Sequence, residues 1–382
     1  MPWTETCVMD ERLRFIAACI EGEETMSALC RQFGISRKTG YRWLGRYEAE
    51  GVAGLRDRSR APHTNSRALA DAVVAEVLAV RQRHPTWGPR KVKSWLEDDQ
   101  GSRSWPPASS IGNLFDRAGL TRPRLRRQRT PPQTRPFSAS RQANDVWCVD
   151  FKGWFLTGDG IRVDPFTMSD AHSRYLLRCE VVEHTDQAHV WPHFESAFRE
   201  FGLPKAVRSD NGPPFASRGA AGLSRLAVKL LKAGILPERI APGKPQQNGR
   251  HERMHLTLKQ DTASPPAASL AAQLVRFRDF QRIYNHERPH EALGQQPPAR
   301  VYQRSPRAWD GKLRSPDYPD QVQVRRVRGN GEIKWKSRPI FITKALIGEP
   351  VGLYEIAEDT WQVKYGPIPL VIIKGRDKWK RS

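Results

Sequence analysis

One run of sequence decides how the chain is interpreted: Lys244-Pro245-Gln246-Gln247-Asn248-Gly249-Arg250-His251-Glu252-Arg253-Met254-His255. Taken alone, His251 to His255 spells H-E-x-x-H, the helical pair of zinc ligands of a metalloprotease. Taken with Asp150 and Asp210 upstream, Glu252 is instead the third carboxylate of a magnesium site.

The zinc interpretation is the weaker of the two. Arg250 and Arg253 would place positive charge against the ion, and no clear motif for a third zinc ligand follows His255. A five-residue pattern is also short enough to arise by chance. The magnesium interpretation is therefore favoured, and the zinc protease is kept as an alternative.

The charge of the chain predicts its partner. The 382 residues carry a formal net charge of +22 and an isoelectric point near 10.2, and only 38% of them are hydrophobic. Self-repulsion of that size indicates a polyanionic partner, with nucleic acid as the first candidate and an anionic membrane as the second. The length suggests two to four domains.

Membrane and secretory functions are not expected. No apolar run approaches the roughly 18 residues of a spanning helix, and no secretory signal is visible at the start. The five cysteines are scattered and form no C-x-x-C pair, which is typical of a reducing cytoplasm rather than a disulfide framework. We expect a cytoplasmic protein.

Residues 1–60 are predicted to be a helix-turn-helix DNA-binding domain. Gly34 allows the positive φ of the turn and Ser36 caps the second helix. Core positions are expected at Leu29, Phe33, Ile35 and Trp43, and contacts with DNA at Arg37, Lys38 and Arg42. Three-helix packing without DNA binding is the alternative.

Two residues depart from the usual helix-turn-helix pattern. Cys30 stands where a small alanine is usual, and Gly40 occupies an inward position that normally carries a branched apolar residue.

Residues 61–120 are predicted to form a second helix-turn-helix-like domain, and residues 121–144 an Arg/Pro-rich linker. The linker has no acidic residue and cannot bury a core, so we expect it to lie extended along phosphates. A merely solvated tether is the alternative. The arginines expected to bind DNA are Arg122, Arg124, Arg126, Arg127 and Arg129.

Residues 145–305 are predicted to be a mixed-sheet α/β domain, because strands come first and then alternate with helices. Residues 306–382 contain five or six short strands, which suggests a small C-terminal β-barrel. Its basic residues make it a candidate for holding DNA, and a structural or interaction role is equally open.

Three acids in this core have the placement that a magnesium site requires. Asp150 lies in an apolar strand, where an acid without a partner is costly. Asp210 ends a later strand, and Glu252 begins a helix. The first pair is 60 residues apart and the second pair 42. Two divalent ions held between such carboxylates can stabilise both the attacking and the leaving oxygen of a phosphodiester.

The segments around these acids resemble the three acidic motifs of the DDE transposases, the integrase-core family that includes retroviral integrases. The resemblance rests on Trp147-Cys148-Val149-Asp150, Ser209-Asp210-Asn211-Gly212 and residues 242–253, with a further similarity at residues 284–294. It covers about 145–303. It implies a multidomain α/β protein with a ribonuclease-H-like catalytic core, preceded by all-α helix-turn-helix units and followed by the barrel.

The same resemblance implies an activity and its residues. Asp150, Asp210 and Glu252 would bind two Mg²⁺, with Mn²⁺ as a substitute, and Lys259 would contact the DNA end. The implied function is that of a bacterial insertion-sequence transposase that binds terminal inverted repeats as a homo-oligomer on double-stranded DNA, hydrolyses strands at the ends and joins the 3′-hydroxyl to target DNA.

Two departures from the retroviral pattern stand out. The gap of 42 residues before Glu252 is longer than the retroviral spacing and implies an insertion near residues 216–226. The paired histidines and cysteines of the retroviral zinc-binding N-terminal domain are missing, so a helix-turn-helix replaces it.

Two alternatives concern the acids. Asp164 or Asp170 would replace Asp150 if the first acid is misassigned. A DNA-binding regulator of the same fold without catalysis is the rival function.

Overall fold

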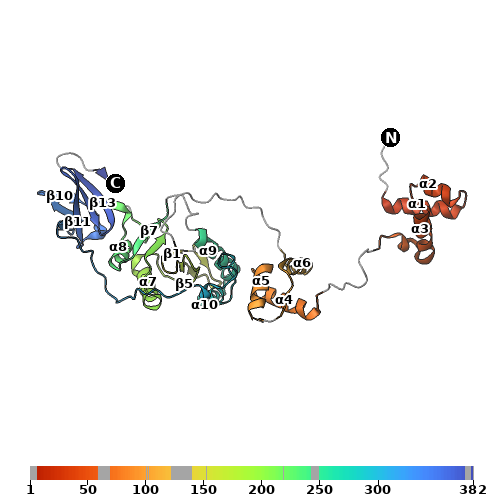
Figure 1. Cartoon of the computed structure of the whole chain (residues 1–382), viewed down its shortest axis with the longest axis horizontal. Coiled ribbons are helices and arrows are strands. Elements are labelled where there is room, and N and C mark those ends of the chain that lie inside the picture. The colour runs from red at the N-terminus through yellow and green to blue at the C-terminus, as the bar shows by residue number, and fades with distance from the viewer. Residues whose placement is uncertain are drawn as a thin grey trace. The chain divides into compact units, whose positions relative to one another are not determined.

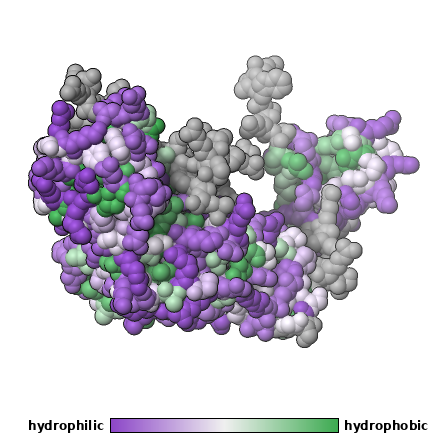
Figure 2. Space-filling view, turned by 60° about the vertical axis from the view of Figure 1, so that its left-hand side comes forward, coloured by the Kyte–Doolittle hydropathy of each residue, from purple (hydrophilic) through white to green (hydrophobic). Residues whose placement is uncertain are grey.

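The computed structural model describes residues 7–58, 69–99, 101, 103–121, 140–151, 153–217, 219–241, 249–374 and 380–381. The chain divides into two compact units, Met1–Ala68 and Leu69–Ser382 (Figure 1). Within the described ranges, no helix combines the length and the apolar character needed to cross a bilayer. The face drawn in Figure 2 is largely hydrophilic, with hydrophobic residues in small patches.

The first unit is a three-helix domain with the expected helix-turn-helix. Its elements are α1 (Val8–Glu21), α2 (Met26–Gln32), α3 (Arg37–Glu50) and the 3₁₀ turn η1 (Gly51–Leu55). Gly34 has φ +65° in the turn, and the Ser36 hydroxyl accepts a hydrogen bond from Thr39 N at the start of α3. Leu29 and Trp43 are buried, and Phe33 and Ile35 pack against them.

The two unusual residues of this domain are in contact and compensate for each other. A Cβ built on Gly40 would lie 2.6 Å from Cys30 Sγ and 3.0 Å from Phe15 Cζ. The sulfur atom therefore occupies the volume that a larger side chain at position 40 would need. Each departure from the helix-turn-helix pattern explains the other, and the packing of α2 on α3 is kept.

The second unit begins with three further helices, α4 (Asp71–Arg83), α5 (Pro89–Asp99) and α6 (Ala108–Arg117). Val77, Val92 and Ile111 are fully buried, one from each helix, and Trp87 joins their cluster. The His84 ring stacks on Trp87 with 3.9 Å between ring centroids. These helices form one hydrophobic cluster within residues 61–120, where a second helix-turn-helix-like domain is predicted.

A mixed five-stranded sheet follows, with strand order β5-β4-β1-β6-β7. β1 pairs with β4 in the antiparallel sense and with β6 in the parallel sense, and β6 pairs with β7 in parallel. The strands are β1 (Val146–Phe151), β4 (Pro165–Asp170), β5 (Leu176–Val181), β6 (Ala206–Ser209) and β7 (Leu236–Arg239). A short hairpin of β2 (Phe155–Leu156) and β3 (Arg162–Val163) precedes β4.

Helices cover both faces of this sheet, and strand alternation decides which residues meet them. Phe166 and Met168 of β4 share a hydrophobic cluster with α7 (Gln187–Phe201) and α8 (Arg225–Lys232). Thr167 and Ser169 point to the opposite face and contact α9 (Gly249–Thr262). α10 (Leu270–His286) packs beside α9 through a separate cluster that includes Met254 and Phe277.

The residues that the structure describes do not confirm the predicted small β-barrel at the C-terminus, because their strands do not close. The strands form an open sheet in the order β14-β13-β12-β11-β8 and a separate pair of β9 and β10. Their bounds are β8 (Gln323–Arg326), β9 (Glu332–Trp335), β10 (Arg338–Phe341), β11 (Pro350–Ala357), β12 (Thr360–Tyr365), β13 (Ile368–Lys374) and β14 (Lys380–Arg381).

A helix of the core explains why no closing strand is needed. Leu223, Ala227 and Val228, at and around α8, belong to the same hydrophobic cluster as Val351 and Val363 of the open sheet. These apolar side chains are thus covered by α8 in place of a further strand. Lys232 and Glu349 form an ion pair of 2.6 Å across this junction, with both side chains largely buried.

Candidate active site

Asp150 and Asp210 lie at the carboxyl ends of adjacent parallel strands. The register pairs Val146 with Ala206 and Cys148 with Arg208, an offset of 60 residues. The same 60 residues separate the two aspartates, so continuing the register brings them level. Neighbouring strands are about 4.8 Å apart, and equivalent positions point to the same face. Extended two residues past Cys148 and Arg208, this register predicts that the first two acids lie close together.

Both aspartates accept a hydrogen bond from a backbone N–H at this edge of the sheet. Asp150 Oδ1 accepts a hydrogen bond of 2.8 Å from Phe151 N, and its side chain is 21% exposed. Asp210 Oδ1 accepts one of 3.0 Å from Gly212 N, which fixes the turn after β6. A Cβ at position 212 would lie 3.0 Å from Asp210 Oδ2, so glycine gives this carboxylate its room.

Two histidines of α9 attach this helix to the sheet. His251 is buried, with Nε2 2.7 Å from Thr167 Oγ1 and Nδ1 2.8 Å from Ser169 Oγ. His255 Nε2 lies 2.7 Å from the same Thr167 hydroxyl, and His255 Nδ1 lies 3.8 Å from Asp150 Oδ2. Thr167 stands opposite Asp150 in the β1–β4 pairing. The histidine pair thus holds α9 over the strand position of the first acid.

Burial determines the charge state of His251. Its removal from water lowers the pKa of the imidazole to about 3, so the ring is neutral near neutral pH. A neutral ring can donate through one nitrogen and accept through the other, as the two hydroxyl partners require.

The H-E-x-x-H pattern is used here for hydrogen bonding. Both ring nitrogens of His251 and Nε2 of His255 are engaged by the hydroxyls of Thr167 and Ser169. Over the residues that the structure describes, no group of three or more histidine, cysteine, aspartate or glutamate side chains could hold a metal ion. The histidine pair accordingly has no further zinc ligand among those residues.

Glu252 is not gathered with the two aspartates. Its side chain is exposed on the first turn of α9, one helical turn before His255. By the strand register two of the three predicted acids are expected to lie close together, and the third is on a helix whose later turn reaches Asp150.

The donor chemistry of these residues fits a hard divalent cation. Asp150 and Asp210 present oxygen ligands at one sheet edge, and Glu252 carries a further carboxylate on the neighbouring helix. Mg²⁺ uses one or two carboxylates and keeps several water molecules, so a pair of adjacent aspartates is a sufficient starting set.

The alternative acids have structural roles. Asp170 is 1% exposed; its Oδ1 accepts hydrogen bonds from Ser173 N and Oγ, and its Oδ2 accepts one from Asn144 N. Burial raises the pKa of Asp170 against the effect of these donors. Asp164 pairs with Arg162 at 2.8 Å. These partners tie both carboxylates to turns, away from the pair on β1 and β6.

The basic residues predicted to contact DNA fall into two groups. Arg37, Lys38 and Arg42 are exposed on α3, and Lys259 is exposed on α9, seven residues after Glu252. The linker arginines Arg122, Arg124, Arg126, Arg127 and Arg129 lie outside the described residues.

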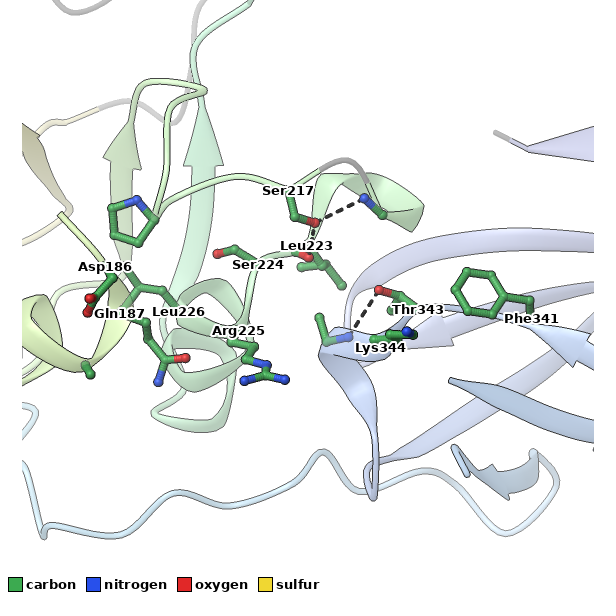
Figure 3. A pocket seen from close by; sticks show the side chains of 14 residues that line it. Asp186, Gln187, Ser217, Leu223, Ser224, Arg225, Leu226, Phe341, Thr343 and Lys344 are labelled. Carbon is green, nitrogen blue, oxygen red and sulfur yellow. Dashed lines mark hydrogen bonds between the residues drawn. The ribbon is translucent and has the colours of Figure 1, made fainter. Parts of the chain in front are cut away.

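A cavity of about 760 Å³ opens between the core and the C-terminal sheet (Figure 3). Asp186, Pro214 and Arg225 line it from the core, and Phe341 and Lys344 line it from the other side. Pro214 belongs to the loop that follows Asp210. This loop is held by Ser217, whose hydroxyl donates to Leu223 O and accepts from Gly219 N.

Comparison with known proteins agrees with this architecture. Integrase core domain models match residues 140–245 and 233–298, a helix-turn-helix domain model matches residues 11–63, and a homeodomain-like domain model matches residues 39–115. The two integrase matches include Asp150, Asp210 and Glu252 between them.

Two curated relatives come from insertion elements. An uncharacterized protein of insertion element IS476 from Xanthomonas euvesicatoria is 28% identical over 230 residues, covering 60% of this chain and 64% of the relative. An uncharacterized protein of insertion element IS407 from Burkholderia multivorans is 25% identical over 273 residues, covering 70% of this chain and 91% of the relative. The chain thus spans just under two thirds of the first relative.

Among solved structures, the integrase catalytic core domain of HTLV-2 in complex with magnesium is 14% identical, with a TM-score of 0.34. The aligned region covers 43% of this chain and 100% of the HTLV-2 chain. The domain matches define the class of this protein: it combines an integrase core with helix-turn-helix units. The chain belongs to the transposase and integrase family.

Proposed function

We propose that this protein is the transposase of a bacterial insertion sequence. It binds the terminal inverted repeats, hydrolyses DNA strands at the ends of the element and joins the freed 3′-hydroxyl to target DNA. The observation that supports this proposal is the parallel register of β1 and β6, whose 60-residue offset matches the separation of Asp150, in β1, from Asp210, directly after β6. The net charge of +22 supports DNA as the substrate.

In this proposal Asp150, Asp210 and Glu252 would hold two Mg²⁺, for which Mn²⁺ would substitute. The ions would supply charge stabilisation at the attacking and leaving oxygens of the phosphodiester. Gly212 N orients the Asp210 carboxylate, and His255 and Thr167 fix α9 against β1. Glu252 joins the aspartates when DNA is bound.

The remaining parts of the chain bind and position DNA. Arg37, Lys38 and Arg42 contact the element ends, Lys259 contacts the DNA end near the carboxylates, and the linker arginines follow the phosphates. The protein acts as a homo-oligomer on double-stranded DNA in the bacterial cytoplasm. In this proposal the domains meet near residues 60, 120, 144 and 305.

The decisive experiment compares strand nicking at an end-containing duplex with Mg²⁺, Mn²⁺ or chelator. Asp150→Asn, Asp210→Asn and Glu252→Gln are each expected to abolish nicking while leaving binding of the duplex near the wild-type level. Asp164→Asn is the matched control, because it removes one acid in the same domain outside the carboxylate pair. Nicking by Asp150→Asn at the wild-type rate would reject the assignment.

The same assay separates the rival function. A regulator of this fold without catalysis predicts duplex binding by the wild-type protein with no nicking under either metal.

A further inference from the structure

A second cavity, about 470 Å³ in volume, lies at the base of α9. It is lined from α5, from the turn between β4 and β5, from the first turns of α9 and from the segment after α10. We call it the basic cavity and define it by its charged lining residues: Lys91, Arg174, Arg250, Arg253, Arg288 and Glu291.

Positive charge outweighs negative charge in the lining of the basic cavity. Among its lining residues that the structure describes, Glu291 alone is acidic, and this side chain is 72% exposed and pairs with Arg90 at 3.1 Å. Asp261 lies 3.8 Å from Arg288 and is not part of the lining. Clustered cations with so little compensation repel one another unless an anion joins them.

The cations are held mainly by neutral oxygens. Arg174 and Arg250 both donate to the carbonyl oxygen of Ala171, at 2.7 and 3.1 Å, so their guanidinium groups lie close together. Lys91 donates to the carbonyl oxygen of Pro289. Such contacts position the side chains, and a neutral carbonyl oxygen does not cancel the charge of the cation that it holds.

Burial makes this arrangement costly without a ligand. It lowers the pKa of Lys91 to about 7, with Arg288 and Arg253 lowering it further and Glu291 opposing them. Burial also lowers the pKa of Arg174, to which Arg250 adds, and that of Arg288. Protonated side chains that disfavour one another in this way are stabilised when an anion binds among them.

The chemistry of the lining matches a phosphate group. A guanidinium presents paired N–H donors that fit two phosphate oxygens, and three arginines reach the cavity from α9 and the segment after α10. Gly249, at the start of α9, also lines the cavity, so the positive end of the helix dipole adds to the field.

We propose that the basic cavity binds a backbone phosphate of the DNA on which the protein acts. This inference rests on the proposed function and deepens it by adding a contact point. Lys91 belongs to the second helical domain, whereas Arg250 and Arg253 flank Glu252 on α9. One bound phosphate therefore links the helical domain to the helix that carries the third carboxylate.

The test measures duplex binding by fluorescence anisotropy over a range of salt concentrations, in the Asp150→Asn background so that the DNA stays intact. Lys91→Met and Arg253→Ala are each expected to weaken binding about tenfold, as loss of a charged hydrogen bond does. The slope of log K against log salt should fall by roughly 0.9 for each lost phosphate contact.

Arg278→Ala is the matched control. Arg278 is exposed on neighbouring α10, so its substitution removes the same charge outside the cavity. It should change neither affinity nor slope by comparable amounts. The double variant Lys91→Met/Arg253→Ala should lose less than the product of the single losses, because one phosphate is shared. Thermal unfolding of each variant checks that folding is intact.

Each outcome decides the proposal. Equal losses for Arg253→Ala and Arg278→Ala would indicate a general charge effect and overturn it. In a second outcome, inorganic phosphate stabilises the protein, Lys91→Met removes this stabilisation, and Lys91→Met leaves duplex binding unchanged. That result would assign the cavity to a free phosphate compound and would overturn DNA as its ligand. Because binding is read without cleavage, a lack of nicking by the wild-type protein contradicts the proposed function and leaves this result standing.

Discussion

His255 lies against Asp150, with Nδ1 3.8 Å from the Oδ2 atom of the carboxylate, while its Nε2 shares the hydroxyl of Thr167 with His251. A buried histidine on α9 is thereby tied to the strand that carries the first acid of the proposed site. The contact gives α9 a fixed position relative to β1, and it defines His255 as a positioning residue.

Replacing His255 tests this positioning role. His255→Ala is expected to lower the nicking rate by roughly 10- to 100-fold, as loss of an outer-shell partner does, with duplex binding little changed. His255→Asn, which keeps a hydrogen-bonding side chain, should recover part of the rate. His184→Ala removes an exposed histidine and serves as the control. A similar loss of nicking rate in His255→Ala and His184→Ala would show that His255 has no specific role.

The Thr167 hydroxyl is expected to contribute to stability. Thr167→Val keeps the shape of the side chain but leaves Nε2 of His251 and His255 buried without this partner. The free energy of unfolding should fall by about 1–3 kcal/mol. Urea denaturation measures the change, and Thr360→Val, at a half-exposed position of β12, should stay within about 0.5 kcal/mol of wild type. Equal values for the two variants would contradict the network.

The close approach of Gly40 to Cys30 predicts that Gly40→Ala destabilises the protein, although the same substitution stabilises an open helix. Gly40→Ala at an open helix position would stabilise by up to about 1 kcal/mol, because alanine favours the helix. Here the new Cβ meets Cys30 Sγ, so we expect a loss of about 1–3 kcal/mol instead. Cys30→Ala/Gly40→Ala should recover most of that loss. Denaturation of the full chain, followed for its N-terminal transition, measures both; a stabilised single variant would refute the clash.

Stability should fall in mild acid at the junction of the second helical domain and the core. Burial lowers the pKa of His84, against the opposing effect of Glu287, and lowers that of His290 to about 3. The unfolded chain binds protons near pH 6.5, so the stabilisation is complete above that pH and is lost as the pH falls toward 3.

The free energy of unfolding should change with pH by no more than about 1.4 kcal/mol per pH unit for each histidine. Urea midpoints between pH 6.5 and 4 measure it. His84→Gln is expected to flatten the curve, and an unchanged slope would exclude His84 as a source.

Much of the fold and part of the site could be predicted from the sequence. The helix-turn-helix follows from Gly34 and Ser36, whose effects are local, and the strands around Asp150 and Asp210 follow from short apolar runs that end in turns. The H-E-x-x-H spacing identified the pair of histidines, yet their partners Thr167 and Ser169 lie more than 80 residues away in the chain. No local pattern contains that information.

The order of helices and strands, the positive charge and the 60-residue spacing of the two aspartates can be predicted from the amino acids alone, because turn chemistry and hydrophobic periodicity act between near neighbours. The folded structure established that this spacing equals the β1–β6 register. It also decided that α8, rather than a further strand, covers the C-terminal sheet and that Lys91 meets Arg253 in one cavity. These features depend on which surfaces pack across long separations, where burial and charge act together on residues that share no local pattern.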